Sequence, residues 1–433
     1  MVDNRIKIFG ASDCYGLSDD LSFTIRAEYI MRDEVDYISL RKAVDMLEER
    51  FGFLKVSLKK NMREFYYIPN PRPWVVKNTD MPIPLNCEES NDQLIAFSYN
   101  GKSIYTDVYH GQMDGTGIYR LTKALLYNYC CVRYQRSLDV PDVAKPDDVD
   151  TEDEATDVYY DFYNKMRETG IPDSVSKAIL QKPCKAPMQL DRMGLVHMDM
   201  DKRTTIKFTI PQADLIQYCS SYDGSPVTVL ALILSEAIYS IHNDSSQMIQ
   251  ISIPVNLRPA LGVKNTIAST YSNIMIQYDE KIRKKDLEMQ GTLCRGIVIR
   301  YSDADVIKKQ TFEYCSKLAL LQKVPLRFIK QVAARHIAKT MKTGQTASTT
   351  YTGRSLFGEM EEYVDSMYFD VDSFGMGVNM VVASFKDTFY ISIDQDWDEG
   401  VYKDAIFDVL VKRGIRYNVH YEGPLRTAVM KNI

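Results

Sequence analysis

Residues 104–117 constrain the fold of this chain more than any other stretch. Up to Tyr109 they are rich in β-branched and aromatic residues, which fit the pleated surface of a strand. Three glycines then fall within seven positions, and apolar residues follow at spacings of three and four, as on one face of a helix. The segment therefore predicts a strand, a loop and a helix in succession, and the loop carries His110 and Asp114.

Length and composition bound the remaining possibilities. A chain of 433 residues suggests two domains of roughly 200 residues each, and we place the change near the connector 182–187, giving domains 1–185 and 186–433. Hydrophobic residues make up 45% and charged residues 26%, which is typical of a globular protein. The net charge of −5 argues against a nucleic-acid partner.

The expected location is the cytoplasm. No apolar segment follows Met1, so no secretory signal is expected. The most apolar long run, 226–241, is interrupted by Ser235 and Glu236 and is too short for a membrane span. The eight cysteines are scattered without paired spacing, which favours reduced intracellular thiols.

Periodicity predicts a mixed α/β fold in both halves of the chain. In the first half we expect a helix over 37–51, strands within 53–68, and a hairpin over 94–109 whose Asn100-Gly101 pair would form a type I′ turn. In the second half, strands are expected at 204–210, 249–255, 272–278, 349–351, 366–371, 377–385 and 388–394. Helices are expected at 227–241, as two long helices over 279–342 divided near Pro325, and at 397–412 before Gly414.

Residues 139–157 contain nine acidic residues and one lysine. We interpret this segment as a solvated, mobile surface loop, with a docking site for a basic partner as the alternative.

Of the five histidines, only His110 lies beside glycines, an acid and a strand-to-helix junction; the others are His197, His242, His336 and His420. No histidine pair has metal-ligand spacing, which argues against a zinc enzyme. The glycine-rich nucleotide loops and the Gly-x-Ser-x-Gly elbow of serine hydrolases are also absent.

Two interpretations of His110 and Asp114 remain open on the local sequence. In the first, Asp114 caps the helix by accepting a backbone N–H, and His110 is a packed core residue. In the second, His110 is a general base, because an ordinary histidine pKa of about 6.5 allows it to accept a proton near neutral pH and return it.

Residues 109–115, Tyr-His-Gly-Gln-Met-Asp-Gly, resemble the His-His-x-x-x-Asp-Gly motif of the chloramphenicol-acetyltransferase-like superfamily. This group includes peptide-synthetase condensation domains, alcohol acetyltransferases and BAHD acyltransferases. Further segments resemble family landmarks in family order: 255–259 (Val-Asn-Leu-Arg-Pro), 272–273 (Ser-Asn), 350–353 (Thr-Tyr-Thr-Gly) and 372–377 (Asp-Ser-Phe-Gly-Met-Gly). The likeness spans about residues 10–415, with two departures: Tyr109 replaces the first motif histidine, and Ser373 is inserted in the late glycine motif.

The resemblance implies a fold of two similar α/β lobes, a pseudo-dimer with a central tunnel that His110 reaches. His110 would act as general base for acyl transfer from a thioester. Asp114 would be a positioning residue that pairs with Arg258 and not with the histidine. Tyr109 and Gly115 would support the site, and Gly115 and Gly117 would let the backbone pass close to substrate.

Gly375 and Gly377 would shape the tunnel, although a bulged strand is the alternative for these late glycines. The co-substrate would be acyl-CoA or a phosphopantetheine thioester, with no permanently bound cofactor and no metal. The partners would be a small-molecule hydroxyl or amine acceptor and, in the alternative, a carrier protein. We expect a monomer. A catalytically idle condensation-like binding module, or an unrelated two-domain binding protein, are the other classes that remain.

Overall fold

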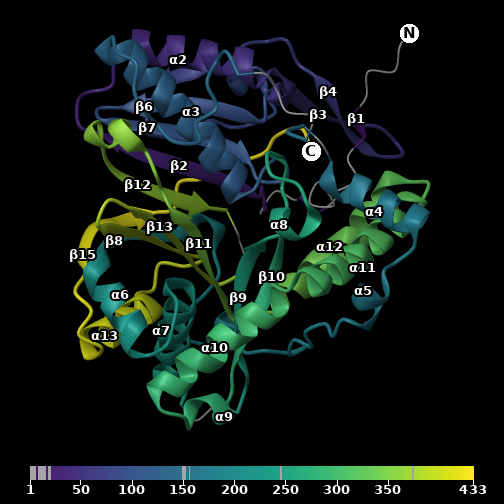
Figure 1. The fold of residues 1–433 in the computed structure, drawn as a ribbon, viewed down its shortest axis with the longest axis vertical. Helices are drawn as coiled ribbons and strands as arrows, with labels where there is room; N and C mark the ends of the chain where they lie inside the picture. Colours follow the sequence, from purple (N-terminus) through teal and green to yellow (C-terminus); the bar gives the residue numbers. More distant parts are fainter. Residues whose placement is uncertain are drawn as a thin grey trace.

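The computed structural model describes residues 6–7, 16–17, 21–148, 153–155, 157–243, 246–372 and 375–433. Within these ranges the chain forms two lobes, each built on a mixed β-sheet with helices packed against it (Figure 1). The first lobe, mostly purple and blue, lies at the top of Figure 1, and the second, teal and yellow, lies below it. The predicted mixed α/β class is confirmed.

Among the described residues, the sheet of the first lobe has five strands, in the order β12 (Val364–Val371), β2 (Thr24–Met31), β7 (Ser103–Tyr109), β6 (Ile95–Asn100) and β5 (Val76–Asn78). The helices α2 (Tyr37–Arg50) and α3 (Gly115–Tyr134) pack against it. The apolar stripes that predicted these helices are buried in one core, which contains Leu40, Val44, Leu47, Ile118, Leu121 and Leu125.

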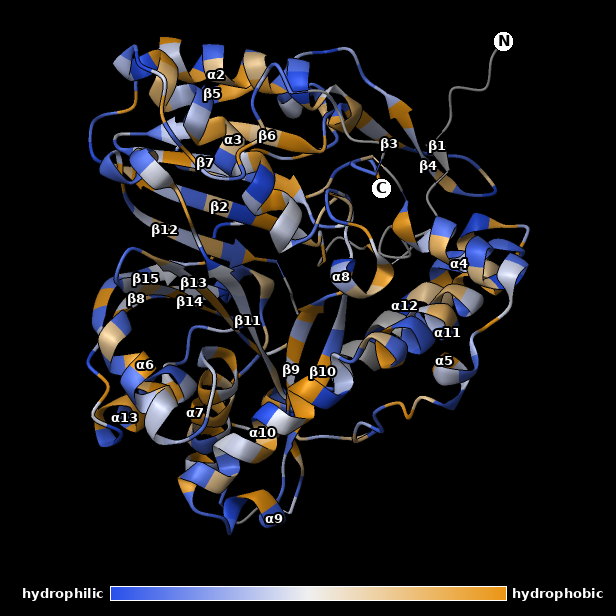
Figure 2. Cartoon of the chain, in the orientation of Figure 1, coloured by the Kyte–Doolittle hydropathy of each residue, from blue (hydrophilic) through white to orange (hydrophobic). Residues whose placement is uncertain are grey.

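The sheet of the second lobe has seven strands within the described ranges: β10 (Tyr271–Tyr278), β9 (Ile249–Asn256), β11 (Ala347–Arg354), β13 (Val378–Phe385), β14 (Thr388–Gln395), β8 (Thr204–Pro211) and β15 (Asn418–Pro424). Its helices are α6 (Gln212–Ser221), α7 (Pro226–Ile241) and α13 (Val401–Lys412). Figure 2 shows α7 as largely hydrophobic, and most of its side chains are buried in the second core. In the described part of the chain no single helix could cross a membrane by length and hydropathy; α6 and α7 meet that criterion only as a pair bent by 84°.

The two sheets repeat one arrangement. The order β2-β7-β6-β5 in the first lobe matches β8-β14-β13-β11 in the second. In each lobe a hairpin (β6–β7 or β13–β14) is flanked by a parallel strand on one side and an antiparallel strand on the other. A helix, α3 or α13, follows each hairpin. The repeat is one of topology, since no tandem repeat is visible in the sequence.

One strand from the second half of the chain, β12, belongs to the sheet of the first lobe, and we call it the exchanged strand. It pairs with β2 in the first sheet. Lys207 of β8 reaches across to the same region and forms ion pairs with Glu28 of β2 and Asp370 of β12. The division into 1–185 and 186–433 stays a prediction, and this strand crosses it.

The remaining described elements lie around the two lobes. A small sheet contains β1 (Ile6–Lys7), β4 (Phe65–Pro69) and β3 (Val56–Lys60). The other helices are α4 (Val158–Thr169), α5 (Asp173–Lys177), α8 (Arg258–Leu261), α9 (Glu280–Arg283), α10 (Leu287–Tyr301), α11 (Ala304–Gln322) and α12 (Arg327–Thr343). In Figure 1, α11 and α12 lie at the side of the molecule, next to α4 and α5.

Two local predictions are wrong in detail. The region 279–342 holds three long helices and not two, because the carboxylate of Asp303 accepts the N–H groups of Asp305 and Val306 and so begins α11 as a separate helix. The hairpin is present, but Asn100 pairs with Ser103, which makes Gly101 and Lys102 the central residues. Glycine at the first central position, here with φ +55°, is the arrangement of a type II′ turn.

The interpretation of 139–157 as a solvated loop fits the exposed residues Asp139, Asp142, Asp147 and Asp148 but not the whole segment, of which residues 149–152 and 156 lie outside the described residues. Val140, Val143 and Ala144 are buried in the first core. Glu154 is only 1% exposed, and its carboxylate pairs with Arg50 at 2.8 Å and with Arg120. A buried charge must be paired to be tolerated, so this acid belongs to the interior.

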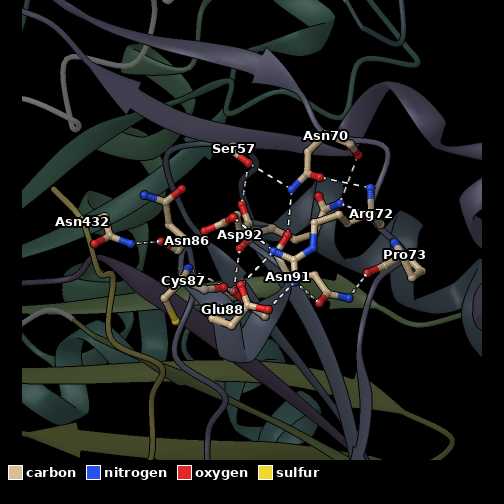
Figure 3. Close-up of polar contacts among 12 residues, drawn as sticks. Ser57, Asn70, Arg72, Pro73, Asn86, Cys87, Glu88, Asn91, Asp92 and Asn432 are labelled. Atoms are coloured by element: carbon tan, nitrogen blue, oxygen red, sulfur yellow. Dashed lines mark hydrogen bonds and ion pairs between the residues drawn. The ribbon is translucent and has the colours of Figure 1, made fainter.

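The C-terminal residues tie the second half of the chain to the first lobe. The N–H of Leu85 donates to the carbonyl of Val429 at 2.9 Å, and Leu85 in turn accepts from Lys431 at 3.0 Å. The amide of Asn432 donates to the carbonyl of Asn86 at 2.8 Å (Figure 3). Next to this contact, an Arg72-centred network of polar side chains fixes the turn before β6 (Figure 3).

Candidate active site

His110 lies in the five-residue loop between the end of β7 and the start of α3. Its backbone N–H donates to the carbonyl of Phe23 at 2.9 Å. Its Nδ1 lies 3.1 Å from the carbonyl oxygen of Met113. Because a carbonyl oxygen only accepts, this contact places the proton on Nδ1 and leaves Nε2 with its lone pair.

The imidazole is packed between aromatic rings. The ring of Phe23 stacks on it with centroids 4.5 Å apart and planes 6° from parallel, and the ring of Tyr271 lies 5.6 Å away, tilted by 35°. Burial of the ring lowers the pKa of His110, and the negative charge of Asp114 opposes this shift only in part. The neutral, proton-accepting form is therefore favoured at neutral pH.

Asp114 is both the helix cap and the ion-pair partner that were expected. Its Oδ1 accepts the N–H of Gly117 at 3.0 Å, at the N-terminus of α3. Its two oxygens also accept bidentate hydrogen bonds from Arg258 at 2.8 and 2.9 Å, and Oδ2 accepts the N–H of Thr270 at 2.9 Å. The carboxylate is thus used by these groups and not by the imidazole.

Arg258 comes from the other lobe, at the start of α8 just after β9. Its remaining N–H groups donate to the carbonyls of Thr266 at 2.9 Å and Ala268 at 2.8 Å and to the side chain of Asn256. The side chains of Arg258 and Asp114 are only 3% and 7% exposed. The pair therefore joins the two lobes beside the His110 loop, through fully hydrogen-bonded buried charges.

The two motif glycines have different surroundings. A Cβ on Gly115, the first residue of α3, would meet nothing within 4 Å. A Cβ on Gly117 would lie 2.2 Å from the carbonyl oxygen of Ile267. The close approach of the segment that follows α8 therefore requires glycine at position 117, and a close approach of substrate to this backbone stays a prediction.

Tyr109 and the late glycines have structural surroundings of their own. Tyr109 is fully buried in a separate cluster that includes Leu94. The N–H groups of Gly375 and Gly377 donate to Oδ2 of Asp396 at 2.8 and 2.9 Å. Both glycines have positive φ, 84° and 81°, whereas Ser373, the inserted residue, lies outside the described residues. Their role in shaping a tunnel stays a prediction.

Several groups around His110 could not be identified from the sequence. Phe23 and Tyr271 are single aromatic residues far from His110 in sequence, and neither stands in a motif that was identified. The contact between Nδ1 of His110 and the carbonyl of Met113 could not be predicted, because every residue has a backbone carbonyl and the sequence does not mark which one is used. Two other histidines have structural partners in the second lobe: His242 bonds to the hydroxyl of Tyr402, and His420 to that of Thr209.

Within the described residues, no cluster of three or more His, Cys, Asp or Glu side chains is placed to hold a metal ion. A small cavity of about 20 Å³ lies between α6, α7 and α10, with Tyr218, Glu236 and Gln290 among its lining residues. None of the predicted site residues lines it. The cavity is therefore separate from the loop that carries His110.

No family model matches the sequence, and no curated protein matches it. Solved structures do match. The epimerization domain from the third module of tyrocidine synthetase B superposes with a TM-score of 0.62 at 13% identity, over 95% of this chain and 96% of that one. TRI101 of F. graminearum, solved with coenzyme A and deoxynivalenol, gives 0.58 at 14% identity, over 95% and 99%. The chain has the chloramphenicol-acetyltransferase-like fold.

The first condensation domain of the CDA synthetase also matches, with a TM-score of 0.58 at 9% identity over 94% of this chain and 96% of that one. Identities this low show the fold alone. The two-lobe fold implied by the His-x-x-x-Asp-Gly motif is confirmed over nearly the whole chain.

Proposed function

We propose that this protein is an acyltransferase that moves an acyl group from a thioester to the hydroxyl or amine of a small-molecule acceptor. His110 is the general base, and the protein acts as a monomer in the cytoplasm. The donor is acyl-CoA or a carrier-bound phosphopantetheine thioester that reaches His110 through a passage between the lobes. No resident cofactor or metal is involved.

The observation that carries the proposal is the hydrogen bond between Nδ1 of His110 and the carbonyl of Met113. It fixes the tautomer in which Nε2 is the proton acceptor, and the lowered pKa keeps the ring neutral. A histidine held in this state can serve as a base without first losing a proton to solvent.

In the proposed reaction, one proton moves from the acceptor to His110 and then to the thiolate that leaves. Nε2 of His110 takes the proton from the acceptor O–H or N–H as the acceptor heteroatom attacks the thioester carbonyl. The new C–O or C–N bond forms, and the carbonyl oxygen carries a negative charge that a backbone N–H of the loop stabilises. The C–S bond then breaks, and the thiolate takes the proton back from Nε2, which restores the neutral ring. No covalent enzyme intermediate is needed, because holding both substrates in contact supplies much of the rate.

In this proposal Asp114 and Arg258 are positioning residues. Their bidentate pair holds the start of α3 against the segment after α8, and so fixes the loop that presents His110. Gly115 and Tyr109 support the same loop, one at the first turn of α3 and one at the end of β7.

Three of the matched structures support the two candidate donors. TRI101 was solved with coenzyme A, which supports acyl-CoA. Condensation and epimerization domains belong to synthetases, which supports a carrier-bound thioester as the alternative. The low identities leave the choice to experiment.

The test is an acyl-transfer assay with the wild-type protein and the His110→Ala variant. Free thiol release and product mass are followed for a panel of acyl-CoA donors with alcohols and amines, and in parallel for acyl groups loaded on carrier proteins. We expect transfer by the wild-type protein and a loss of about 10²- to 10⁴-fold in the variant.

The matched control is His420→Ala, which removes a histidine hydrogen-bonded to Thr209 in the second lobe. It should leave the rate unchanged. Equal, background-level turnover by wild type and His110→Ala with both CoA and carrier donors would contradict the proposal and favour an idle binding module. Transfer from carrier-loaded donors alone would assign a condensation-type activity.

A further inference from the structure

Phe23 has an unusual backbone conformation next to the site. It lies immediately before β2 and has φ +50°, in the left-handed region that bulky side chains rarely adopt. Such strain persists only where the surrounding structure imposes it, and it is concentrated at functional sites.

A buried carboxylate holds the backbone of Phe23 in this conformation. Oδ2 of Asp372, which follows the exchanged strand β12, accepts the N–H groups of Ser22 at 2.9 Å and of Phe23 at 3.2 Å. Oδ1 of the same side chain accepts Nη1 of Arg203 at 2.6 Å, and the two charged side chains are only 1% and 9% exposed. The backbone at residues 22 and 23 is therefore fixed by groups from the second half of the chain.

Phe23 contacts His110 twice. Its carbonyl accepts the backbone N–H of His110, and its ring lies parallel to the imidazole at 4.5 Å. The Nδ1 contact with Met113 fixes the direction of one edge of the imidazole, but rotation about that hydrogen bond would still tilt the plane. The stacked ring removes this remaining freedom.

We propose that Phe23 is a positioning residue for acyl transfer: the flat face of its ring, placed by the Asp372–Arg203 pair, sets the plane of the His110 imidazole and so the direction of Nε2. This inference rests on the proposed function and adds a residue to it. A flat side chain is needed at position 23, and apolar volume alone is not enough.

The second lobe supports this reading, since it repeats the same topology with Asp396, and not a histidine, at the position equivalent to His110. Thr24 pairs with Tyr109 at the end of β7, and Thr204 pairs in the same way with Gln395 at the end of β14. The residue before Thr204 is Arg203, which is not aromatic. The aromatic residue therefore occurs in the lobe that has an imidazole to hold.

The experiment compares Phe23→Leu with Phe23→Tyr, and it has a spectroscopic arm and a kinetic arm. The chain has five histidines, so the ring C–H signals of His110 can be assigned by comparison with His110→Gln. A stacked phenyl ring shifts these signals upfield. We expect that shift in the wild type and in Phe23→Tyr, and its loss in Phe23→Leu. This arm needs no substrate, so it stands even if the acyl-transfer proposal fails.

In the kinetic arm, Phe23→Leu should lower kcat by about 10- to 100-fold with KM changed less than about twofold, because a misdirected base affects the chemical step. Phe23→Tyr should restore most of kcat. The control is Phe312→Leu, which removes another half-buried ring, on α11 and tilted by 31° to the ring of Tyr163 on α4, and should change neither quantity.

Wild-type His110 signals without an upfield shift would overturn the proposal, as would a Phe23→Leu variant with unchanged kcat. Equal losses of kcat in Phe23→Leu and Phe23→Tyr would also overturn it, since only the tyrosine variant keeps a flat ring at position 23. If Phe23→Leu fails to fold, Phe23→Met is measured in its place, and the wild-type spectrum still decides.

Discussion

The two hairpin-to-helix junctions of this molecule have the same architecture and different contents. In the first lobe five residues, 110–114, connect β7 to α3, and in the second lobe five residues, 396–400, connect β14 to α13. The first position holds His110 in one lobe and Asp396 in the other. The last position, which caps the helix, holds Asp114 in one and Gly400 in the other.

The difference shows how one scaffold can carry either the proposed base or a structural anchor. Asp396 accepts the N–H groups of Gly375 and Gly377, and so holds the segment that leads from the exchanged strand β12 into β13. His110 in contrast bonds through Nδ1 to the carbonyl of Met113, and in the proposed function its Nε2 serves the acceptor. Topology alone therefore does not make the site, and function depends on the side chains placed on it.

The largest effect is expected from giving the first junction the residue of the second. His110→Asp replaces the imidazole with a shorter and less basic carboxylate, and should lower acyl transfer by about 10²- to 10⁴-fold. The reverse comparison is Asp396→Asn, which keeps an oxygen that can accept from the two glycines and should leave the rate within about twofold. Steady-state assays of both variants measure this contrast, and equal losses would show that the junctions share one role.

Next in size is the loss of the interlobe ion pair. Arg258→Ala leaves the Asp114 carboxylate buried without its partner and should reduce the free energy of unfolding by about 3–5 kcal/mol. The comparison in the second lobe is Arg413→Ala, whose partner Glu236 is more accessible, at 17% exposure, so the loss should be closer to about 1 kcal/mol. Urea denaturation of both variants checks the order. A smaller loss for Arg258→Ala than for Arg413→Ala would contradict the assigned importance of the first pair.

A smaller effect is expected at the third residue of each helix. Gly117→Ala puts a methyl group against the carbonyl of Ile267 and should cost about 1–3 kcal/mol of stability. The equivalent position in α13 is Lys403, which already carries a long side chain, so Lys403→Ala should stay within about 0.5 kcal/mol. Thermal unfolding measures the stability of both variants. A Gly117→Ala variant as stable as the wild type would mean that the backbone at Ile267 can move aside without a loss of stability.

The smallest effect concerns pH. Burial lowers the pKa of His110 below the ordinary value of about 6.5, and the active form is the neutral ring. Activity should therefore be constant near neutral pH and fall only as the pH drops through that lowered pKa. A kcat/KM profile whose acid limb has its midpoint below 6.5 is expected, and a midpoint at or above 6.5 would contradict a buried neutral imidazole.

The sequence was most informative where a local pattern determines a local structure. The stripes of α2 and α3, the strand ending at Tyr109 and the left-handed φ of 69° at Gly414 all follow from short-range rules. The family motif added the pairing of Asp114 with Arg258, which are 144 residues apart and which no local rule joins.

What could not be predicted depends on tertiary contacts. The burial of Glu154 required two arginines from distant helices, and the acidic composition around it pointed to solvent instead. The turn at Gly101 was fixed by strand register and not by the Asn-Gly pair alone. Phe23 had no motif, and its conformation depends on Asp372, which is nearly 350 residues away.

The exchanged strand also has a consequence for the order in which the protein can be built. β2 ends at Met31, but the strand that covers its outer edge begins only at Val364. During translation the edge of β2 therefore stays unpaired until most of the polypeptide, including β12, has left the ribosome. An open edge invites pairing with other chains, so we expect the charged residues Arg26 and Glu28 on β2 to keep the nascent chain from aggregating in this interval.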